Sequence, residues 1–272
     1  MNLDGRDFVV GDIHGAYDLV LKGLKEIKFD ARQDRLFSVG DLVDRGRQSA
    51  RAQAFLDYKG LHGAVRGNHE QTFLDLYAET PDPDQRVLEM VARLFHMEWW
   101  LDVSKDDRSN ILKKFAALPV AIEIQTRRGT VGIVHGEVPI GMDWDTFLKR
   151  LEKGDVDVYQ AALQGRGRIQ SNNQSGVVGI DRLFVGHTVR ADGPKQYGNV
   201  FAIDTGAIFS EQDANPKCGL TIANLLFKTS LIAGITVDPG QIAGSHLFVL
   251  SADDHSEKGG GGEIEAFSNY TG

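Results

Sequence analysis

The sequence predicts an α/β protein in which helices flank a mixed or parallel sheet. Short apolar runs alternate with segments of helical spacing through residues 6–76, which is the pattern of strand–helix units. Three of the apolar runs are followed closely by a glycine and polar residues, as expected of strands that end in tight turns. Because ligands collect at the carboxyl ends of strands in such sheets, the same blocks are the candidate functional site.

The N-terminal elements alternate in type. A strand is expected at 8–10, and apolar residues then recur at helical spacing from Tyr17 to Ile27. The elements expected next are a strand at 36–39, a helix at 50–58 and a strand at 63–65.

Residues 73–117 are predicted to be mostly helical, with a break near residues 81–83, where two prolines stand close together. One stripe of apolar residues in this region has helical spacing. Because such stripes usually serve packing, we expect it to lie in the core or to cap it. Its members are Val87, Met90, Val91, Leu94 and Phe95.

The second half of the chain starts with an expected hairpin of 120–125 and 130–134, turning at Arg128 and Gly129. A helix at 147–163 and strands at 183–185, 200–203 and 220–226 are expected to follow. Composition changes after about residue 235, so we expect a catalytic domain over 1–235 and a C-terminal extension over 236–272. The extension would hold one strand at 246–250 and a permissive run of four glycines at 259–262.

Composition is that of an ordinary globular protein, with 272 residues of which 42% are apolar and 25% charged. The net charge of −8 argues against nucleic acid or an anionic membrane as the main partner. A single cysteine, Cys218, allows no internal disulfide and favours a reducing compartment. Since neither a signal peptide nor an apolar run of membrane-spanning length is evident, we expect a cytoplasmic protein, and a monomer.

Five short blocks combine glycine with residue types that bind metals: GDIHG (11–15), GDLVDRG (40–46), GNHE (67–70), VHGE (134–137) and GHT (186–188). Carboxylate, imidazole and amide oxygen groups are ligands for Mn²⁺, Fe and Zn²⁺. Such a set suits two metal ions side by side, and paired metals indicate phosphoester chemistry. The candidate residues are Asp12, His14, Asp41, Asn68, His69, His135 and His187.

Other residues of these blocks suit the handling of a phosphate. Arg45 and Arg66 carry guanidinium groups that match phosphate geometry and neutralise its charge. His69 follows Asn68 and could protonate a leaving alkoxide, with Asp44 as the candidate to orient its other ring nitrogen.

Other phosphate chemistries lack their motifs. Asn224 stands six positions after Cys218, where a cysteine phosphatase loop needs arginine. No G-x-x-x-x-G-K-[ST] loop and no G-x-S-x-G elbow occurs. Water activated by metal remains as the nucleophile.

From Phe8 to about Leu226 the sequence resembles the PPP family of metallophosphatases, in particular the phage-type serine/threonine phosphatases and their bacterial relatives. The similarity extends to the sequence around the blocks, as in SVGDLVDRG (38–46), VRGNHEQ (65–71), FVGHT (184–188) and IDTGAIF (203–209). It implies a calcineurin-like β-sandwich core of mixed sheets flanked by helices, with two divalent metal ions, Mn²⁺ above all and Fe or Zn²⁺ as alternatives.

The resemblance also implies roles for residues. Asp12, His14 and Asp41 would hold one ion, and Asp41, Asn68, His135 and His187 the other. His69 would be the general acid paired with Asp44, and Arg45, Arg66 and Arg166 would hold the phosphate while a hydroxide shared by the metals attacks. The segment around Arg166 reads GRGRIQS (165–171) and departs from the phage pattern, with Gln164 and Gly165 in place of Trp-Asn.

The resemblance predicts a phosphatase for phosphoserine and phosphothreonine in proteins, with phosphotyrosine as a further substrate. The main alternative is a symmetrical diadenosine tetraphosphate hydrolase of the same superfamily. Those enzymes typically have VARG and GNHD, so Asp44 and Glu70 favour the phosphoprotein. A second alternative is a metal- or phosphate-binding interaction module without catalysis, against which the complete ligand set argues.

Overall fold

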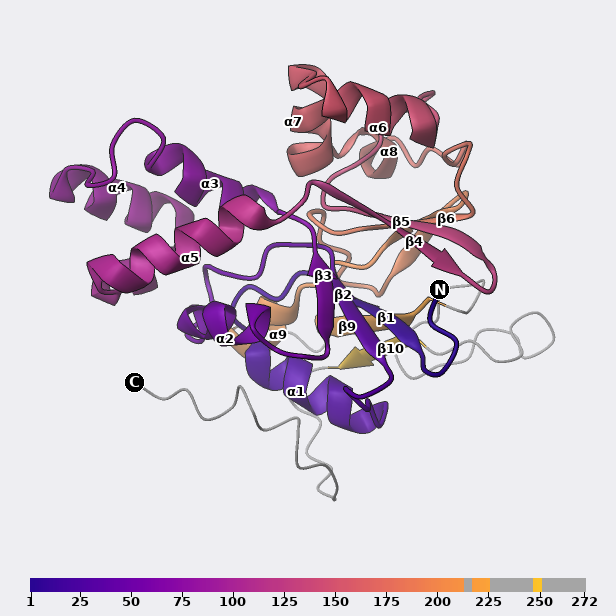
Figure 1. The fold of residues 1–272 in the computed structure, drawn as a ribbon, viewed down its shortest axis with the longest axis horizontal. Helices are drawn as coiled ribbons and strands as arrows, with labels where there is room; N and C mark the ends of the chain where they lie inside the picture. Colours follow the sequence, from indigo (N-terminus) through magenta and orange to yellow (C-terminus); the bar gives the residue numbers. More distant parts are fainter. Residues whose placement is uncertain (213–216, 226–246, 251–272) are drawn as a thin grey trace.

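The computed structural model describes residues 1–212, 217–225 and 247–250, and these residues form two sheets packed face to face between layers of helices (Figure 1). The first sheet has the strand order β10-β9-β1-β2-β3 and the second β4-β5-β6-β8-β7. The strands are β1 (Asp7–Val10), β2 (Arg35–Ser38), β3 (Leu61–Ala64), β4 (Ala121–Thr126), β5 (Gly129–Val134), β6 (Arg182–Val185), β7 (Lys195–Tyr197), β8 (Val200–Ala202), β9 (Leu220–Asn224) and β10 (Leu247–Leu250).

Both sheets are mixed. β1, β2 and β3 run parallel, while β9 pairs antiparallel with β1 in the register Val9↔Ala223. In the second sheet β5, β6 and β8 run parallel, and β4 and β7 are antiparallel edge strands. Parallel neighbours end at the same edge of a sheet, so the loops after these strands meet there.

Helices cover the outer faces of both sheets (Figure 1). α1 and α2 lie against the first sheet, α6, α7 and α8 lie over the second, and α3, α4 and α5 form a lobe at one side. The helices are α1 (Tyr17–Glu26), η1 (Ser49–Arg51), α2 (Ala52–Leu56), α3 (Asn68–Leu76), α4 (Gln85–Phe95), η2 (Glu98–Asp102), α5 (Lys105–Ala117), α6 (Trp144–Glu152), α7 (Val156–Gln164), α8 (Gly167–Gln170) and α9 (Ala207–Gln212). In these ranges no helix is both long and apolar enough to cross a membrane.

Alternation along the strands builds separate cores on the two faces of each sheet. Phe8 and Val10 pack toward α1 and α2, whereas Val9 between them packs against the second sheet. Likewise Phe184 faces the first sheet, while its neighbours in β6 face the α6–α7 layer. Successive strand residues point to opposite faces, and because both faces are covered at the centre of each sheet, β1 and β6 are buried at every position.

One expected helix was wrong, and three elements of the structure were not expected. The expected continuous helix over 147–163 is two helices, because Gly154 adopts φ +71° and the side chain of Asp155 caps α7 by accepting the N–H of Val158 at 3.2 Å. β7, α8 and α9 were not anticipated at all.

The apolar stripe of α4 is not part of the core. Leu88 and Ala92 form its buried face, and of the stripe only Val91 packs against the core. Helical spacing shows which residues share a face, but it cannot show whether another element covers that face. The solvent-exposed members of the stripe are Val87, Met90, Leu94 and Phe95.

Part of the expected extension contributes to the fold. The strand expected at 246–250 is β10, which pairs antiparallel with β9. The four glycines at 259–262 lie outside the described residues, and the boundary at residue 235 stays a prediction.

Candidate metal centre

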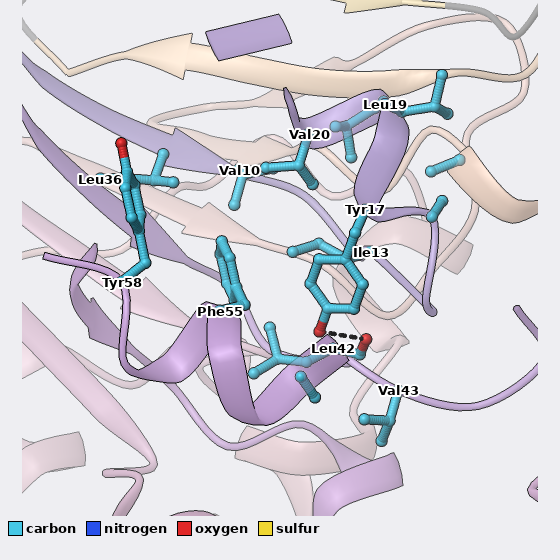
Figure 2. Close-up of a cluster of buried hydrophobic side chains, with 14 of the residues drawn as sticks. Val10, Ile13, Tyr17, Leu19, Val20, Leu36, Leu42, Val43, Phe55 and Tyr58 are labelled. Atoms are coloured by element: carbon cyan, nitrogen blue, oxygen red, sulfur yellow. Dashed lines mark hydrogen bonds between the residues drawn. The ribbon is translucent and has the colours of Figure 1, made fainter. Parts of the chain in front are cut away.

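The loops after β1 and β2 carry the first ligand candidates and are bonded to each other. The backbone N–H groups of Ile13 and His14 both donate to the Asp41 carbonyl, at 3.0 and 2.9 Å. Ile13, Leu42 and Val43 are fully buried between the polar residues of these loops and pack with the core under α1 and α2 (Figure 2). The apolar residues therefore anchor both loops and leave the carboxylates and imidazoles on the other side.

Figure 2 also shows how α1 holds the second loop. The hydroxyl of Tyr17, the first residue of α1, donates to the Leu42 carbonyl at 3.0 Å. Burial of a polar carbonyl is tolerated when it has such a donor.

The loops bring the candidate ligands into two adjoining groups. His14, Asp41 and His69 form one group, and Asp41, His135 and His187 form the other. The possible ligand atoms within each group lie within 4.8 Å of one another, and all of these residues are buried except His187, which is half-buried. Asp41 belongs to both groups, as expected of a carboxylate placed between two cations.

Backbone carbonyls orient two of the imidazoles. Nδ1 of His14 lies 2.9 Å from the Val43 carbonyl, and Nδ1 of His135 lies 2.8 Å from the Val39 carbonyl. A carbonyl oxygen can only accept, so each Nδ1 carries the proton and each Nε2 is left with a lone pair toward the site. Metal-binding histidines are held in this way.

The chemistry of the donor set fits a cation near His135. Its Nε2 lies 3.0 Å from Oδ1 of Asn68 and 3.3 Å from Oδ2 of Asp41, so atoms with lone pairs converge there. Burial alone would lower the pKa of His135, but the Asp41 carboxylate raises that pKa to about 10. Either a proton or a metal ion must separate these atoms, and a divalent cation would satisfy all of them.

Asp12 supports the same conclusion. Its Oδ2 accepts the backbone N–H of His187 at 3.0 Å, while its buried Oδ1 has no hydrogen-bond partner among the described residues. Burial raises the pKa of Asp12 well above its usual range, and Asp204 nearby raises it further. A buried carboxylate oxygen without a donor is costly unless a cation binds it.

His69 is held as part of a pair with Asp44. Its Nδ1 lies 2.7 Å from Oδ2 of Asp44, and the indole N–H of Trp99 donates to Oδ1 of the same carboxylate at 2.8 Å. The Nε2 of His69 faces Arg45, whose Nη2 is 3.1 Å away, while Nη1 of Arg45 lies 2.9 Å from Nε2 of His14. The guanidinium of Arg45 therefore lies between the imidazoles of His14 and His69.

The other two arginines lie elsewhere. Arg66 donates to the carbonyls of Ala116 and Leu118 at the end of α5 and to the side chains of Gln71 and Tyr159. These bonds hold the α5 end rather than a phosphate, and its role at the site stays a prediction. Arg166 is exposed and precedes α8, close enough to His187 for its charge to contribute to the lowered pKa of that imidazole.

The family model described as calcineurin-like phosphoesterase matches residues 8–191. The chain belongs to this family. Its expected fold class, a sandwich of mixed sheets flanked by helices, is thereby confirmed.

Two curated relatives differ in the activity that they are named for. The serine/threonine-protein phosphatase 1 of Salmonella typhimurium is 35% identical over 215 residues, which cover 75% of this chain and 88% of the relative. The symmetrical bis(5'-nucleosyl)-tetraphosphatase of Thioalkalivibrio sulfidiphilus is 28% identical over 172 residues, covering 60% of this chain and 63% of the relative. A solved protein serine/threonine phosphatase from Saccharomyces cerevisiae shares the fold, with TM-score 0.52, 16% identity and coverage of 93% of this chain and 82% of that one.

Sequence reasoning missed three residues that shape the site of this calcineurin-like phosphoesterase. Glu70 is fully buried and accepts the backbone N–H groups of Asp41, Leu42 and Gly67, which joins two ligand loops. Burial and the nearby Asp41 carboxylate raise the pKa of Glu70 to about 7, although the N–H groups of Leu42 and Gly67 act in the opposite direction. Only its place inside GNHE could have signalled this role.

Asp204 and Trp99 complete the set of missed residues. Asp204 follows β8 and lies buried near Asp12, and burial raises its pKa to about 6. The rule that polar residues after strands face the site would have found it. Trp99 lies in η2, and nothing in its local pattern connects it with Asp44.

The loops of the phosphoesterase site adopt an unusual backbone. Several of its non-glycine residues lie in the left-handed region, which only asparagine, aspartate and histidine enter with any ease. Such conformations concentrate at functional sites, because the surrounding structure must hold them. The residues and their φ values are His14 (46°), Asp41 (50°), Asp44 (73°), Arg45 (66°) and His187 (66°).

Proposed function

We propose that this calcineurin-like phosphoesterase is a serine/threonine protein phosphatase that hydrolyses phosphoserine and phosphothreonine with two divalent metal ions, Mn²⁺ first among them. The observation that carries the proposal is the buried pair of His69 and Asp44, joined at 2.7 Å. A serine or threonine alkoxide is a poor leaving group unless a proton reaches it during the reaction. An enzyme for such substrates therefore needs a fixed acid.

The metals would be held by two sets of residues that share Asp41. When bound, they would activate a water molecule as nucleophile and neutralise charge on the phosphoryl group. The first set would be Asp12, His14 and Asp41, and the second Asp41, Asn68, His135 and His187.

The remaining residues would act on the substrate itself. Arg45 reaches both His14 and His69 and would bind a phosphoryl oxygen between them. His69 would donate its proton from Nε2, because Nδ1 is engaged with Asp44, and Arg45 would exchange its contact with Nε2 for the phosphoryl oxygen. Arg166 would contribute positive charge from the side of His187. Arg66 would join this clamp only by leaving its bonds to the α5 end.

The tetraphosphatase activity of some relatives is the second candidate. In that reaction the leaving group is itself a phosphate, which departs as a stable anion and needs a proton far less. Identity to the serine/threonine phosphatase of Salmonella typhimurium is 35%, against 28% to the tetraphosphatase of Thioalkalivibrio sulfidiphilus, which also favours the phosphoprotein.

A substrate panel with and without Mn²⁺ tests the proposal. It should contain a phosphoserine peptide, a phosphotyrosine peptide, diadenosine tetraphosphate and p-nitrophenyl phosphate. We expect the phosphoserine peptide to be hydrolysed with a higher kcat/KM than the dinucleotide. A strong preference for the dinucleotide would assign the second activity instead, and inertness toward every substrate would favour a module without catalysis.

The variant His69→Asn tests the role of the acid. We expect kcat for the phosphoserine peptide to fall by roughly 10²–10⁴, the usual contribution of a general acid, with metal content unchanged. His69 also belongs to one of the two possible metal groups, so loss of metal would reassign it as a ligand. His62→Asn is the matched control, because that histidine is exposed on β3 and away from the site.

A further inference from the structure

The helical lobe beside the sheets makes two hydrogen bonds to the turn that contains Asp44 and Arg45. The indole N–H of Trp99 in η2 donates to Oδ1 of Asp44 at 2.8 Å. The backbone N–H of Arg45 donates to the carbonyl of His96, the residue that ends α4, at 2.7 Å. The turn that carries the acid's partner and the phosphate arginine is thus bonded to a segment about fifty residues further along the chain.

The carboxylate of Asp44 has few ways to be held. It is fully buried, and in the described part of the chain its side chain bonds only to His69, through Oδ2, and to Trp99, through Oδ1. The terminal torsion of an aspartate is broad, so one bond alone leaves the plane of the carboxylate free to rotate. The indole N–H fixes that plane, and with it the direction from which His69 is held.

Trp99 is itself fixed in place. Its ring packs edge-on against Phe73 of α3, with centroids 5.7 Å apart, and against Trp100, with centroids 5.3 Å apart. A donor mounted on a packed ring loses little further freedom when it bonds, so it can hold its acceptor accurately.

We propose that Trp99 is a positioning residue for the reaction, acting through Asp44 on His69. This inference rests on the proposed role of His69 as general acid. It assigns a part in catalysis to η2, which lies between α4 and α5 of the helical lobe, whereas Asp44 lies in the loop after β2 and His69 is the second residue of α3.

The test variant is Trp99→Phe, which keeps an aromatic ring for Phe73 and removes the N–H. Trp100→Phe is the matched control, since Trp100 also lies in η2 but its indole N–H donates to the Tyr77 hydroxyl, at 3.0 Å. Each variant loses one indole hydrogen bond, but only Trp99→Phe loses the bond to Asp44.

The leaving group separates positioning from general damage. For a phosphoserine peptide we expect Trp99→Phe to lower kcat roughly tenfold to a hundredfold, as loss of such outer partners does. For p-nitrophenyl phosphate, whose leaving group needs no proton, we expect a change of less than about threefold. An equal loss with both substrates, or no loss with either, would overturn the inference.

A double-mutant cycle with His69→Asn shows whether Trp99 acts through the histidine. In the His69→Asn background, Trp99→Phe should change the peptide rate by no more than about twofold. A full further loss would mean that Trp99 acts by another route and would refute the inference alone. If His69→Asn by itself leaves the peptide rate unchanged, the proposed function is what fails.

A measurement on the folded protein keeps the inference testable if Trp99→Phe does not fold. The chain has three tryptophans, so an ¹⁵N-labelled sample gives three indole N–H signals. In His69→Asn the signal of Trp99 should shift and that of Trp100 should stay. A Trp99 signal that does not respond to the histidine would also overturn the inference.

Discussion

Replacing Glu70 by glutamine should destabilise the protein strongly, although the two side chains have nearly the same shape. In the structure Oε1 accepts the N–H of Leu42 at 2.7 Å, and Oε2 accepts those of Asp41 at 3.0 Å and Gly67 at 2.8 Å. Glutamine has a single oxygen. Its NH₂ group would therefore face the N–H of Leu42, or in the flipped orientation those of Asp41 and Gly67.

The size of the effect follows from these contacts. In buffer above its pKa of about 7 Glu70 is charged. A hydrogen bond to a charged group contributes roughly 1.5–3 kcal/mol, and a buried donor left without a partner costs about 1–3 kcal/mol. At least one such bond is lost in Glu70→Gln, so we expect the free energy of unfolding to fall by about 2–4 kcal/mol. That is a large part of the roughly 5–15 kcal/mol that stabilises a typical domain.

Urea unfolding in the presence of a chelator is the appropriate assay, because bound metal would add its own stabilisation. Glu137→Gln is the control, since Glu137 also accepts two backbone N–H groups, those of Gly167 and Arg168, but is only half-buried. Glu137→Gln should cost clearly less. A loss below about 1 kcal/mol for Glu70→Gln would refute the argument that its carboxylate joins the two loops.

Two further predictions concern the metal ligands. Asp41→Asn should reduce metal content at both sites, whereas His187→Asn should reduce it at one, because only Asp41 belongs to both ligand groups. Elemental analysis after gel filtration in Mn²⁺ measures the metal content of each variant. Equal losses in the two variants would contradict a shared ligand. Gly186→Ala should lower metal affinity with the fold retained, because its Cβ would lie 2.1 Å from Oδ1 of Asp12. Unchanged Mn²⁺ titration of Gly186→Ala would show that Asp12 is not needed in its present position.

Much of the site could be predicted because its residues lie next to strands. Asp12 and Asp41 directly follow parallel strands, and the geometry of a sheet brings such positions together whatever the rest of the chain does. The expected pairing of His69 with Asp44 was likewise found at 2.7 Å. Local sequence was sufficient to predict a site residue wherever a single turn determines the direction of its side chain.

Contacts that depend on tertiary packing could not be predicted. Trp99 meets Asp44 only because the helical lobe folds back against the sheet, and 55 residues separate the two in the chain. The guanidinium of Arg66 bonds to the end of α5 rather than toward the ligand loops, which no motif indicates. The apolar stripe of α4 failed for a related reason, because neighbours decide burial and periodicity does not.

The left-handed conformations of the ligand loops carry a consequence for engineering. Each non-glycine residue in this conformation lowers the stability of the folded protein by about 1–2 kcal/mol, somewhat less for aspartate and histidine. Without metal, these loops are therefore held in an unfavourable backbone conformation. Arginine has no side-chain compensation at φ 66°, so a screen that rewards heat resistance alone should enrich Arg45→Gly. Because we propose that Arg45 binds the phosphate, thermostable descendants chosen that way would lose turnover, and selection for durability must be paired with selection for turnover.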